Sequence, residues 1–316
     1  MTPKDRAAYL VTGGAGFIGA NCVGYLLKND CRVRVIDNLS TGKIENIKEY
    51  LPYIEFIEAD VADKKAVNSA TEDMDYILHL AAIPSVQYSI EDPEKANQSM
   101  VTATVALLKA AAARKKIKRV VQATSAAAYG DGAELPKKED MLPAPRSPYA
   151  AAKLSQEFYA YAFANAYGLK VHSLRFFNVY GPKQDPSSPY SGVISIFINK
   201  IISGESPIIY GDGKNTRDFV HVNDAVRALE LACSSPWHGQ SEIINIGTGS
   251  ETSLNQLLDT LNSIAPKRVE AVYQAARSGD VRYSYADISK ARSLIGYEPK
   301  ISIEEGLGNL FEYVAK

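Results

Sequence analysis

The chain of 316 residues contains little cysteine and no excess of charge of either sign. Its cysteines, Cys22, Cys31 and Cys233, are scattered, which argues against a disulfide framework and against a zinc site. Such sparse cysteines are typical of a reducing compartment, so we expect a cytoplasmic protein. The chain has 35 Lys and Arg and 36 Asp and Glu, so no excess of positive charge indicates binding to nucleic acid. No apolar run is long enough to span a bilayer, so we expect no membrane partner. The scattered cysteines lead us to expect no metal either.

The first half of the chain alternates short apolar runs with helical patterns. We expect strands at residues 8–12, 32–36, 54–58, 76–80, 119–123 and 169–175. Helical patterns lie between them at residues 19–29, 64–71, 101–113 and 149–167. Strands that alternate with helices predict right-handed βαβ units, and therefore an α/β fold with a doubly wound parallel sheet.

After residue 176 the pattern changes to polar loops at 181–192 and 211–219, with helices expected at 194–202, 253–264 and 288–295. We interpret residues 1–176 as a dinucleotide-binding domain and residues 177–316 as a smaller C-terminal α/β domain that binds the substrate. Segments near 219–247 are expected to pack back onto the first domain.

A glycine-rich turn follows the first expected strand and opens the first helix. Gly13 allows a tight turn, Gly16 lets the backbone approach a pyrophosphate, and Gly19 permits close packing of helix and strand. Phe17 and Ile18 lie at the helix N-terminus, where free N–H groups favour phosphate. An ordinary glycine-rich turn would look the same in isolation, but its place between strand and helix predicts a Rossmann-type site.

An acidic residue at the end of the second strand indicates which dinucleotide binds. Asp37 can accept hydrogen bonds from the adenosine ribose hydroxyls and would repel a 2′-phosphate, so NAD is favoured over NADP. Asp60 and Val61 follow the third strand, where they can reach the adenine; a helix N-cap is the alternative for Asp60. Asn38 and Ala81 complete the expected cofactor-binding set.

A tyrosine and a lysine lie one turn apart at the start of an expected helix. Tyr149 and Lys153 share a helix face, and a nearby ammonium favours the phenolate form that can accept a proton. Both residues are therefore expected to contact the cofactor as well as the reacting group. Ser125 or Thr124 follows the fifth strand and can hydrogen-bond the reacting oxygen, although a strand-end hydroxyl can also cap the next turn.

Taken together, these motifs resemble the extended short-chain dehydrogenase/reductase superfamily and, within it, the UDP-sugar 4-epimerases. The resemblance runs from end to end through TGGAGFIG, DNLSTG, HLAA, TSAAAYGD, SPYAAAK, RFFNVYGP, GDGKNTRDFVHVNDA and NIGTG. It implies that Ser125, four residues before Tyr129, is the catalytic hydroxyl rather than Thr124. Related dehydratases and decarboxylases carry an acid where this chain has Ala126 and Ala127, which favours oxidation at carbon 4 (C4) followed by re-reduction.

The resemblance also implies a set of substrate contacts. It includes Ser125 and Tyr149 at the reacting carbon and Ser284 near C2 of the sugar. The remaining residues implied to bind the UDP-sugar are Ser85, Asn178, Val193, Tyr210, Arg217, Arg277 and Asp280. The small Ser284 and the loop at 184–191 favour UDP-N-acetylglucosamine and UDP-N-acetylgalactosamine, with UDP-glucose and UDP-galactose as further substrates.

Two alternatives remain open at this point. A UDP-glucuronate 4-epimerase could use Ser85, Gln87 and Ser89 to hold a C6 carboxylate, and a non-catalytic NAD-binding protein could use the same fold. Met100 departs from the asparagine that these epimerases carry on the helix after the fourth strand. The resemblance further implies a homodimer formed through helices near 94–113 and 149–167.

Overall fold

The computed structural model describes residues 6–185, 192–276 and 281–315. Its central feature is a sheet made of short apolar segments, most of them buried on both faces. The strands are β1 (Ala8–Thr12), β2 (Arg32–Asp37), β3 (Ile54–Glu58), β4 (Tyr76–His79), β5 (Arg119–Ser125), β6 (Val171–Phe176) and β11 (Glu242–Ile246). They are parallel and follow the order β11-β6-β5-β4-β1-β2-β3. The predicted Rossmann-type doubly wound sheet is therefore confirmed.

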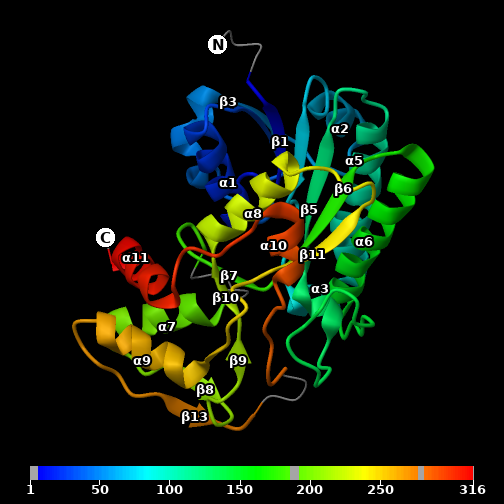
Figure 1. Ribbon diagram of the computed structural model, residues 1–316. Helices are drawn as coiled ribbons and strands as arrows, with labels where there is room; N and C mark the ends of the chain where they lie inside the picture. The colour runs from blue at the N-terminus through cyan, green and yellow to red at the C-terminus, as the bar shows by residue number, and fades with distance from the viewer. Residues whose placement is uncertain (1–5, 186–191, 277–280, 316) are drawn as a thin grey trace.

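Helices cover both faces of this sheet (Figure 1). One layer consists of α2 (Lys64–Ala70), α5 (Ala103–Ala112) and α6 (Pro148–Tyr167). The other consists of α1 (Phe17–Lys28), α8 (Val222–Ser234) and α10 (Ser289–Ile295). Each layer encloses its own apolar core against the strands, as expected when parallel strands are joined by crossover helices.

The helix that carries Tyr149 and Lys153 has clear start and stop signals. Ser147 is the N-cap of α6 and accepts a hydrogen bond from the Ala150 N–H, and Pro148 occupies the first helical position. The helix ends at Gly168, whose φ of +68° is the left-handed conformation common at helix ends. These signals fix where the first turn of α6 lies relative to the end of β5.

The segment before α5 differs from the expected continuous helix at 101–113. Short helices α3 (Val86–Glu91) and α4 (Pro93–Asn97) precede a π-helical turn at Gln98–Thr102, and α5 begins only at Ala103. Two further short helical segments, Ile44–Asn46 and Lys48–Tyr53, connect β2 to β3, and another, Ala126–Tyr129, follows β5.

The C-terminal half builds a smaller lobe beside the carboxyl edge of the sheet. Its core lies between α7 (Val193–Ile202), α9 (Leu254–Ile264) and α11 (Ile303–Ala315). Short strands pair as β7 (Asn178–Tyr180) with β10 (Phe219–His221), β8 (Ile208–Tyr210) with β13 (Val272–Gln274), and β9 (Thr216–Arg217) with β12 (Thr252–Ser253).

The chain returns from this lobe to the large sheet, because β11 pairs with β6 and α8 packs on α1. The division of the chain into domains at residue 176 stays a prediction.

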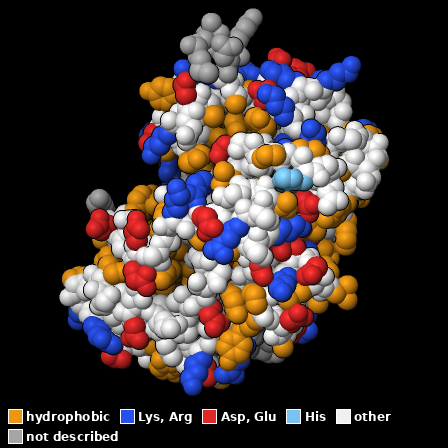
Figure 2. Space-filling view, in the orientation of Figure 1, with side chains coloured by type: hydrophobic (Ala, Val, Ile, Leu, Met, Phe, Trp, Pro, Cys, Tyr) orange, Lys and Arg blue, Asp and Glu red, His pale blue; other side chains and the backbone are white. Residues whose placement is uncertain are grey.

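None of the described helices combines the length and apolar character needed to cross a membrane. On the face shown in Figure 2, positive and negative side chains are interspersed over the coloured residues.

Candidate active site

A cavity of about 970 Å³ lies at the carboxyl edge of the large sheet. Residues at or directly after the carboxyl ends of β1, β2, β3, β4, β5 and β6 line it, because parallel strands end at the same edge. The sequence-predicted residues that line it are Gly13, Gly16, Phe17, Ile18, Gly19, Asp37, Asn38, Asp60, Val61, Ala81, Ser125, Tyr149, Lys153 and Asn178. The fold thus brings together the whole predicted cofactor set and the catalytic set.

The glycine-rich turn has the geometry that its sequence predicts. Gly13 has φ +69°, and a Cβ there would lie 2.7 Å from the Ala81 nitrogen. A Cβ at Gly19 would lie 2.1 Å from the Gly13 carbonyl oxygen. At Gly16, by contrast, a Cβ would meet only that same oxygen, at 3.2 Å, so the missing side chain opens the turn toward the cavity.

The start of α1 suits a phosphate group. No side chain caps this helix, and its first turn lines the cavity at Phe17 and Ile18. The first N–H groups of a helix lack partners within the helix and carry a partial positive charge. The open Gly16 and the uncapped helix N-terminus together fit the pyrophosphate of a dinucleotide.

Asp37 is held rigidly at the next strand end. Its carboxylate accepts hydrogen bonds from the Ala15 N–H at 2.9 Å and from the Leu39 N–H at 2.8 Å. Burial raises the pKa of Asp37, and these two hydrogen bonds act in the opposite direction. A fixed carboxylate at this place can accept ribose hydroxyls and disfavours a 2′-phosphate, which fits NAD.

Asp60 does not cap the following helix, the alternative considered from the sequence. The N-cap of α2 is Asp63, which accepts hydrogen bonds from the Lys65 and Ala66 N–H groups. Asp60 instead accepts a hydrogen bond from the Ala62 N–H and another from the Asn38 side chain at 2.8 Å. It therefore shapes the wall of the cavity where the adenine is expected.

Tyr149 and Ser125 meet at the opposite end of the cavity. The Ser125 hydroxyl caps the helical turn after β5 by accepting a hydrogen bond from the Ala127 N–H at 3.1 Å. It also hydrogen-bonds the Tyr149 side chain, which lowers the pKa of the phenol, whereas burial raises that pKa by a larger amount. The hydroxyl thus acts both as a turn cap and as the neighbour of the expected base.

Lys153 lies one turn further along α6, is 5% exposed, and donates a hydrogen bond from Nζ to the Ala123 carbonyl oxygen at 2.8 Å. Burial lowers the pKa of Lys153 to about 8, and the charge of Glu157 acts against this. The expectation that this ammonium itself lowers the Tyr149 pKa is not met, because Ser125 alone acts in that direction. Deprotonation of Tyr149 therefore calls for a further positive charge in the cavity.

Thr124 supplies a polar atom without a partner. Its side chain is 4% exposed, lines the cavity, and its Oγ1 has no hydrogen-bond partner among the described residues. A buried hydroxyl without a partner is costly, so it is suited to a bound group in the cavity. Sequence reasoning placed Thr124 second to Ser125 and did not expect both to line the site.

The serines considered for a C6 carboxylate are occupied elsewhere. Ser85 does not line the cavity and is the N-cap of α3, accepting a hydrogen bond from the Tyr88 N–H at 2.9 Å. Ser89 donates to the Val86 carbonyl oxygen and accepts from the Tyr149 N–H at 3.0 Å. Gln87 is exposed and hydrogen-bonds Glu91.

The other predicted substrate residues lie in the smaller lobe, beyond the residues that line the cavity. Tyr210 ends β8, Arg217 lies in β9, Val193 begins α7, and Ser284 precedes the bridge between Lys137 and Ala286. Two more predicted contacts, Arg277 and Asp280, lie outside the described residues. Of the predicted diphosphate contacts that the structure describes, Asn178 lines the cavity and Arg217 does not.

Met100 replaces the expected asparagine with an apolar side chain. It is fully buried in the π-helical turn and packs with Ala96 and Ala152, next to Tyr149. Its carbonyl oxygen accepts a hydrogen bond from the Thr104 hydroxyl at 2.6 Å. The substitution therefore adds an apolar contact behind the expected base.

Two lysines that the sequence did not point to cross the edge of the cavity. Lys43 forms an ion pair with Asp185 at 2.6 Å. Lys183 donates a hydrogen bond to the Asn46 carbonyl oxygen and forms an ion pair with Glu49 at 3.2 Å. Lys183 adopts a φ of +69°, and no residue-type pattern signals that conformation. Both contacts join the segment after β7 to the segment after β2.

Among the described residues, no group of three or more His, Cys, Asp or Glu side chains is placed to hold a metal ion. The cavity itself offers a phenol, a hydroxyl and a buried ammonium beside a part that fits a dinucleotide.

Comparison with known proteins places this geometry in a family context. Residues 9–247 match the model of the NAD dependent epimerase/dehydratase family. A putative UDP-glucose 4-epimerase of Methanocaldococcus jannaschii is 40% identical over 306 residues, covering 96% of this chain and 97% of the relative. The crystal structure of the Thermotoga maritima UDP-glucose 4-epimerase with UDP-glucose has a TM-score of 0.91 and 40% identity, covering 97% and 98% of the two chains. The UDP-N-acetylglucosamine 4-epimerase of Methanobrevibacter ruminantium, in complex with UDP-N-acetylmuramic acid, has a TM-score of 0.93 and 37% identity, covering 98% of each chain.

Proposed function

The chain belongs to the NAD dependent epimerase/dehydratase family and is an NAD-dependent nucleotide-sugar epimerase, and we propose that it inverts C4 of UDP-hexoses. The preferred pairs are UDP-N-acetylglucosamine with UDP-N-acetylgalactosamine, and UDP-glucose with UDP-galactose. The observation that carries this proposal is the cluster of Tyr149, Ser125 and Lys153 at one end of a cavity whose other end fits NAD.

Residues of the chain supply the proton chemistry. When bound at this site, NAD would supply the hydride chemistry at C4. Tyr149 accepts the proton of the C4 hydroxyl and gives it back in the same turnover, while Ser125 holds the reacting oxygen by a hydrogen bond. Lys153 keeps most of its charge near pH 7, because its pKa lies at about 8, and it is held by its hydrogen bond to the Ala123 carbonyl oxygen. The further positive charge that favours the ionised phenol would come from the oxidised nicotinamide.

The carboxylates of the cavity support inversion rather than elimination. Those among the described lining residues are Asp37, Asp60 and Asp185, and each is paired away from Tyr149, with Ala15, Asn38 and Lys43 respectively. Elimination of water needs an acid beside the reacting carbon. Ala126 and Ala127 occupy the places next to Ser125, so no acid stands there to assist elimination. The proton that Tyr149 exchanges with the C4 oxygen is the only one that inversion requires.

A neutral sugar suits this site better than a glucuronate. None of Ser85, Gln87 and Ser89 lines the cavity, and the Ser89 hydroxyl already donates to the Val86 carbonyl oxygen and accepts from the Tyr149 N–H. The lining lysines other than Lys153 are Lys43 and Lys183, and both are paired within the chain. UDP-glucuronate is therefore the second candidate, and no contact among the described residues favours it.

We retain the homodimer as part of the proposal. Phe158 and Tyr161 lie on one side of α6 and are 61% and 36% exposed, so this side offers apolar surface that a second copy of the chain could cover. The small residues Ala150 and Ala152 are buried within the chain, so they do not add support for a dimer.

The decisive experiment gives the purified protein UDP-glucose, UDP-N-acetylglucosamine or UDP-glucuronate in turn, without added NAD, and separates the products. We expect C4 epimers of the first two and slower conversion of the third. Tyr149→Phe should keep its bound cofactor and lose turnover by at least about a hundredfold. Formation of a dehydrated or permanently oxidised sugar, or full turnover by Tyr149→Phe, would contradict the proposal.

A further inference from the structure

The polar loop between β8 and β9 is folded around the first turn of α9. The Asn255 N–H donates to the Gly213 carbonyl oxygen at 3.1 Å, and the Leu254 N–H donates to the Asn215 carbonyl oxygen at 3.2 Å. The first N–H groups of a helix have no partners within the helix, so these two bonds satisfy donors that would otherwise remain open. The path of the loop is therefore set by the helix N-terminus.

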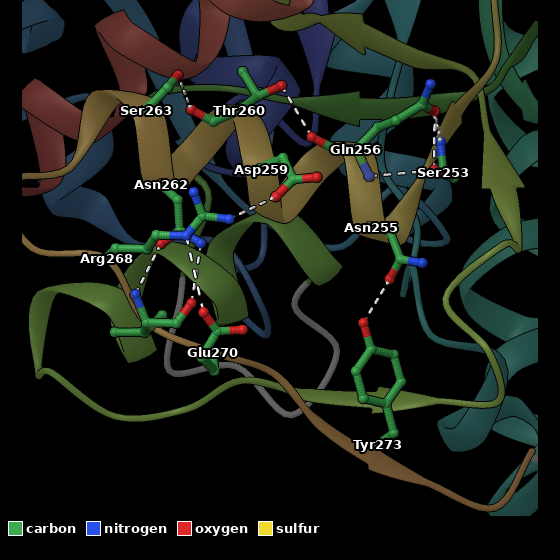
Figure 3. Close-up of polar contacts among 11 residues, drawn as sticks. Ser253, Asn255, Gln256, Asp259, Thr260, Asn262, Ser263, Arg268, Glu270 and Tyr273 are labelled. Carbon is green, nitrogen blue, oxygen red and sulfur yellow. Dashed lines mark hydrogen bonds and ion pairs between the residues drawn. The ribbon is translucent and has the colours of Figure 1, made fainter.

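The side chain of Asn255 joins this loop to a third segment. Its Nδ2 donates to the Asp212 carbonyl oxygen at 3.1 Å, and its Oδ1 accepts a hydrogen bond from the Tyr273 hydroxyl at 3.0 Å. Figure 3 shows Tyr273 rising from β13 toward Asn255 at the start of α9. One amide thus links β13, α9 and the loop after β8.

The fit between Asn255 and the loop is close. Gly213 has φ +70°, and a Cβ there would lie 1.9 Å from the Asn255 Oδ1. Only glycine can pass beneath this amide without displacing it. Arg282 adds a contact from the far side of the loop, since its guanidinium pairs with the Asp212 carboxylate at 3.2 Å.

The same loop leads directly to the cavity. It continues into β9, where Arg217 pairs with Thr252 of β12, and then into Phe219, which pairs with Asn178. The Asn178 N–H donates to the Asp218 carbonyl oxygen at 3.0 Å, and Asn178 lines the cavity. A displacement of the loop would therefore be passed to the residues next to Asn178.

We propose that Asn255 and Tyr273 are positioning residues for the nucleotide end of the substrate, because they hold the loop at 211–215 that sets the place of Arg217. This inference rests on the proposed function, since it takes a UDP-sugar as the substrate, and on the contact of Arg217 with that substrate that the sequence resemblance implies. Neither residue touches the reacting carbon. Their effect should appear in the binding of UDP and not in the chemical step.

Tyr273 offers a variant with little effect on the core. Its side chain is 55% exposed, so replacement by phenylalanine removes the hydrogen bond and leaves the apolar packing of the lobe in place. The same helix provides a matched control farther along α9. Asp259 and Arg268 form an ion pair at 3.3 Å with side chains 69% and 67% exposed, and Figure 3 shows this pair apart from Tyr273.

The experiment measures UDP binding to the NAD-loaded enzyme by calorimetry, together with kcat and KM for the UDP-sugar that is turned over. For Tyr273→Phe we expect the Kd of UDP and the KM to rise about two- to tenfold, the range that follows from losing one neutral hydrogen bond. Asn255→Ala should raise both further, because it loses two hydrogen bonds. In both variants kcat and bound NAD should stay at the wild-type level, as should every parameter of Asp259→Asn.

Two results would overturn the inference, and they are distinguishable. A wild-type enzyme that does not bind UDP would remove the proposed function and this inference with it. Wild-type binding of UDP, with unchanged affinity in both Tyr273→Phe and Asn255→Ala, would remove the inference alone. A fall in kcat at constant KM would also overturn it, because it would assign the two residues to the chemical step.

Discussion

Replacing Lys153 by methionine should stabilise the fold while it abolishes turnover. Burial lowers the pKa of Lys153 from its usual 10.5 to about 8, so the folded chain holds this proton less tightly than the unfolded chain does. At 1.36 kcal/mol for each pKa unit, burying the charged Lys153 lowers the free energy of unfolding at pH 7 by about 3 kcal/mol. The methionine variant also loses the hydrogen bond to the Ala123 carbonyl oxygen, which costs about 1 kcal/mol, so its net gain in the free energy of unfolding is about 2 kcal/mol.

The pH dependence of this gain has a definite sign. Below pH 8 the ammonium is charged in both the folded and the unfolded state, and the penalty for its burial is present in full. Between pH 8 and 10.5 the folded state has already lost the proton while the unfolded state keeps it, so the wild-type protein gains stability as the pH rises. The advantage of Lys153→Met should therefore shrink across this window.

Thermal unfolding of the cofactor-free protein tests both statements. We expect the Tm of Lys153→Met to exceed the wild-type Tm by about 3 °C at pH 7, and the difference to fall toward zero or below by pH 10.5. Lys109→Met, which alters an exposed lysine on α5, should show no such pH dependence. An equal or lower Tm at pH 7, or a difference that stays constant from pH 8 to 10.5, would refute the reasoning.

Three further predictions test other parts of the site. Asp37→Ala should weaken NAD binding and reduce its preference over NADP at least about tenfold, measured by titration of both dinucleotides; an unchanged preference would show that another group selects the cofactor. Ser89→Ala should lower kcat about tenfold with KM unchanged, because the N–H of the catalytic tyrosine loses its acceptor. The cap variant Ser85→Ala should keep kcat, and equal losses in both would contradict a specific role. Lys43→Asp should speed NAD release, and adding Asp185→Lys should restore retention, measured as NAD per chain after desalting; a double variant no better than the single one would exclude the ion pair as the cause.

The large sheet could be predicted from the sequence because its signals are local. The six strands expected from apolar runs all form, and the glycine turn follows β1 as its spacing predicts. Segments near 219–247 were expected to pack back onto the first domain, but the strand β11 and its place beside β6 were not specified, because this pairing depends on contacts between residues far apart in the chain. Helices α3 and α4 were missed as well, since six and five residues are too few to show a helical period.

The site could be predicted only where a backbone motif marks it. Ser85 was implied as a sugar contact by the resemblance, and Ser89 was considered for a C6 carboxylate; the fold shows that both hydroxyls also accept hydrogen bonds from N–H groups at helix N-termini, and the sugar contact of Ser85 stays a prediction. Lys43 and Lys183 were missed, because their partners lie more than a hundred residues away along the chain. Residue type shows that a side chain can form a hydrogen bond or an ion pair, whereas only the fold shows which partner is within reach.

This difference has a consequence for how such a site can change. The cofactor half rests on positions where a Cβ would clash, such as Gly13 and Gly19, so substitution there is strongly constrained. The loop at 211–215 in the smaller lobe is held by single hydrogen bonds from partly exposed residues, such as that of Tyr273 to Asn255. A hydrogen bond of this kind can be lost for about 1 kcal/mol without unfolding the chain. If this loop positions the nucleotide as proposed, differences in nucleotide affinity should arise from substitutions around it, while the glycine turn and the end of β5 keep the same redox chemistry.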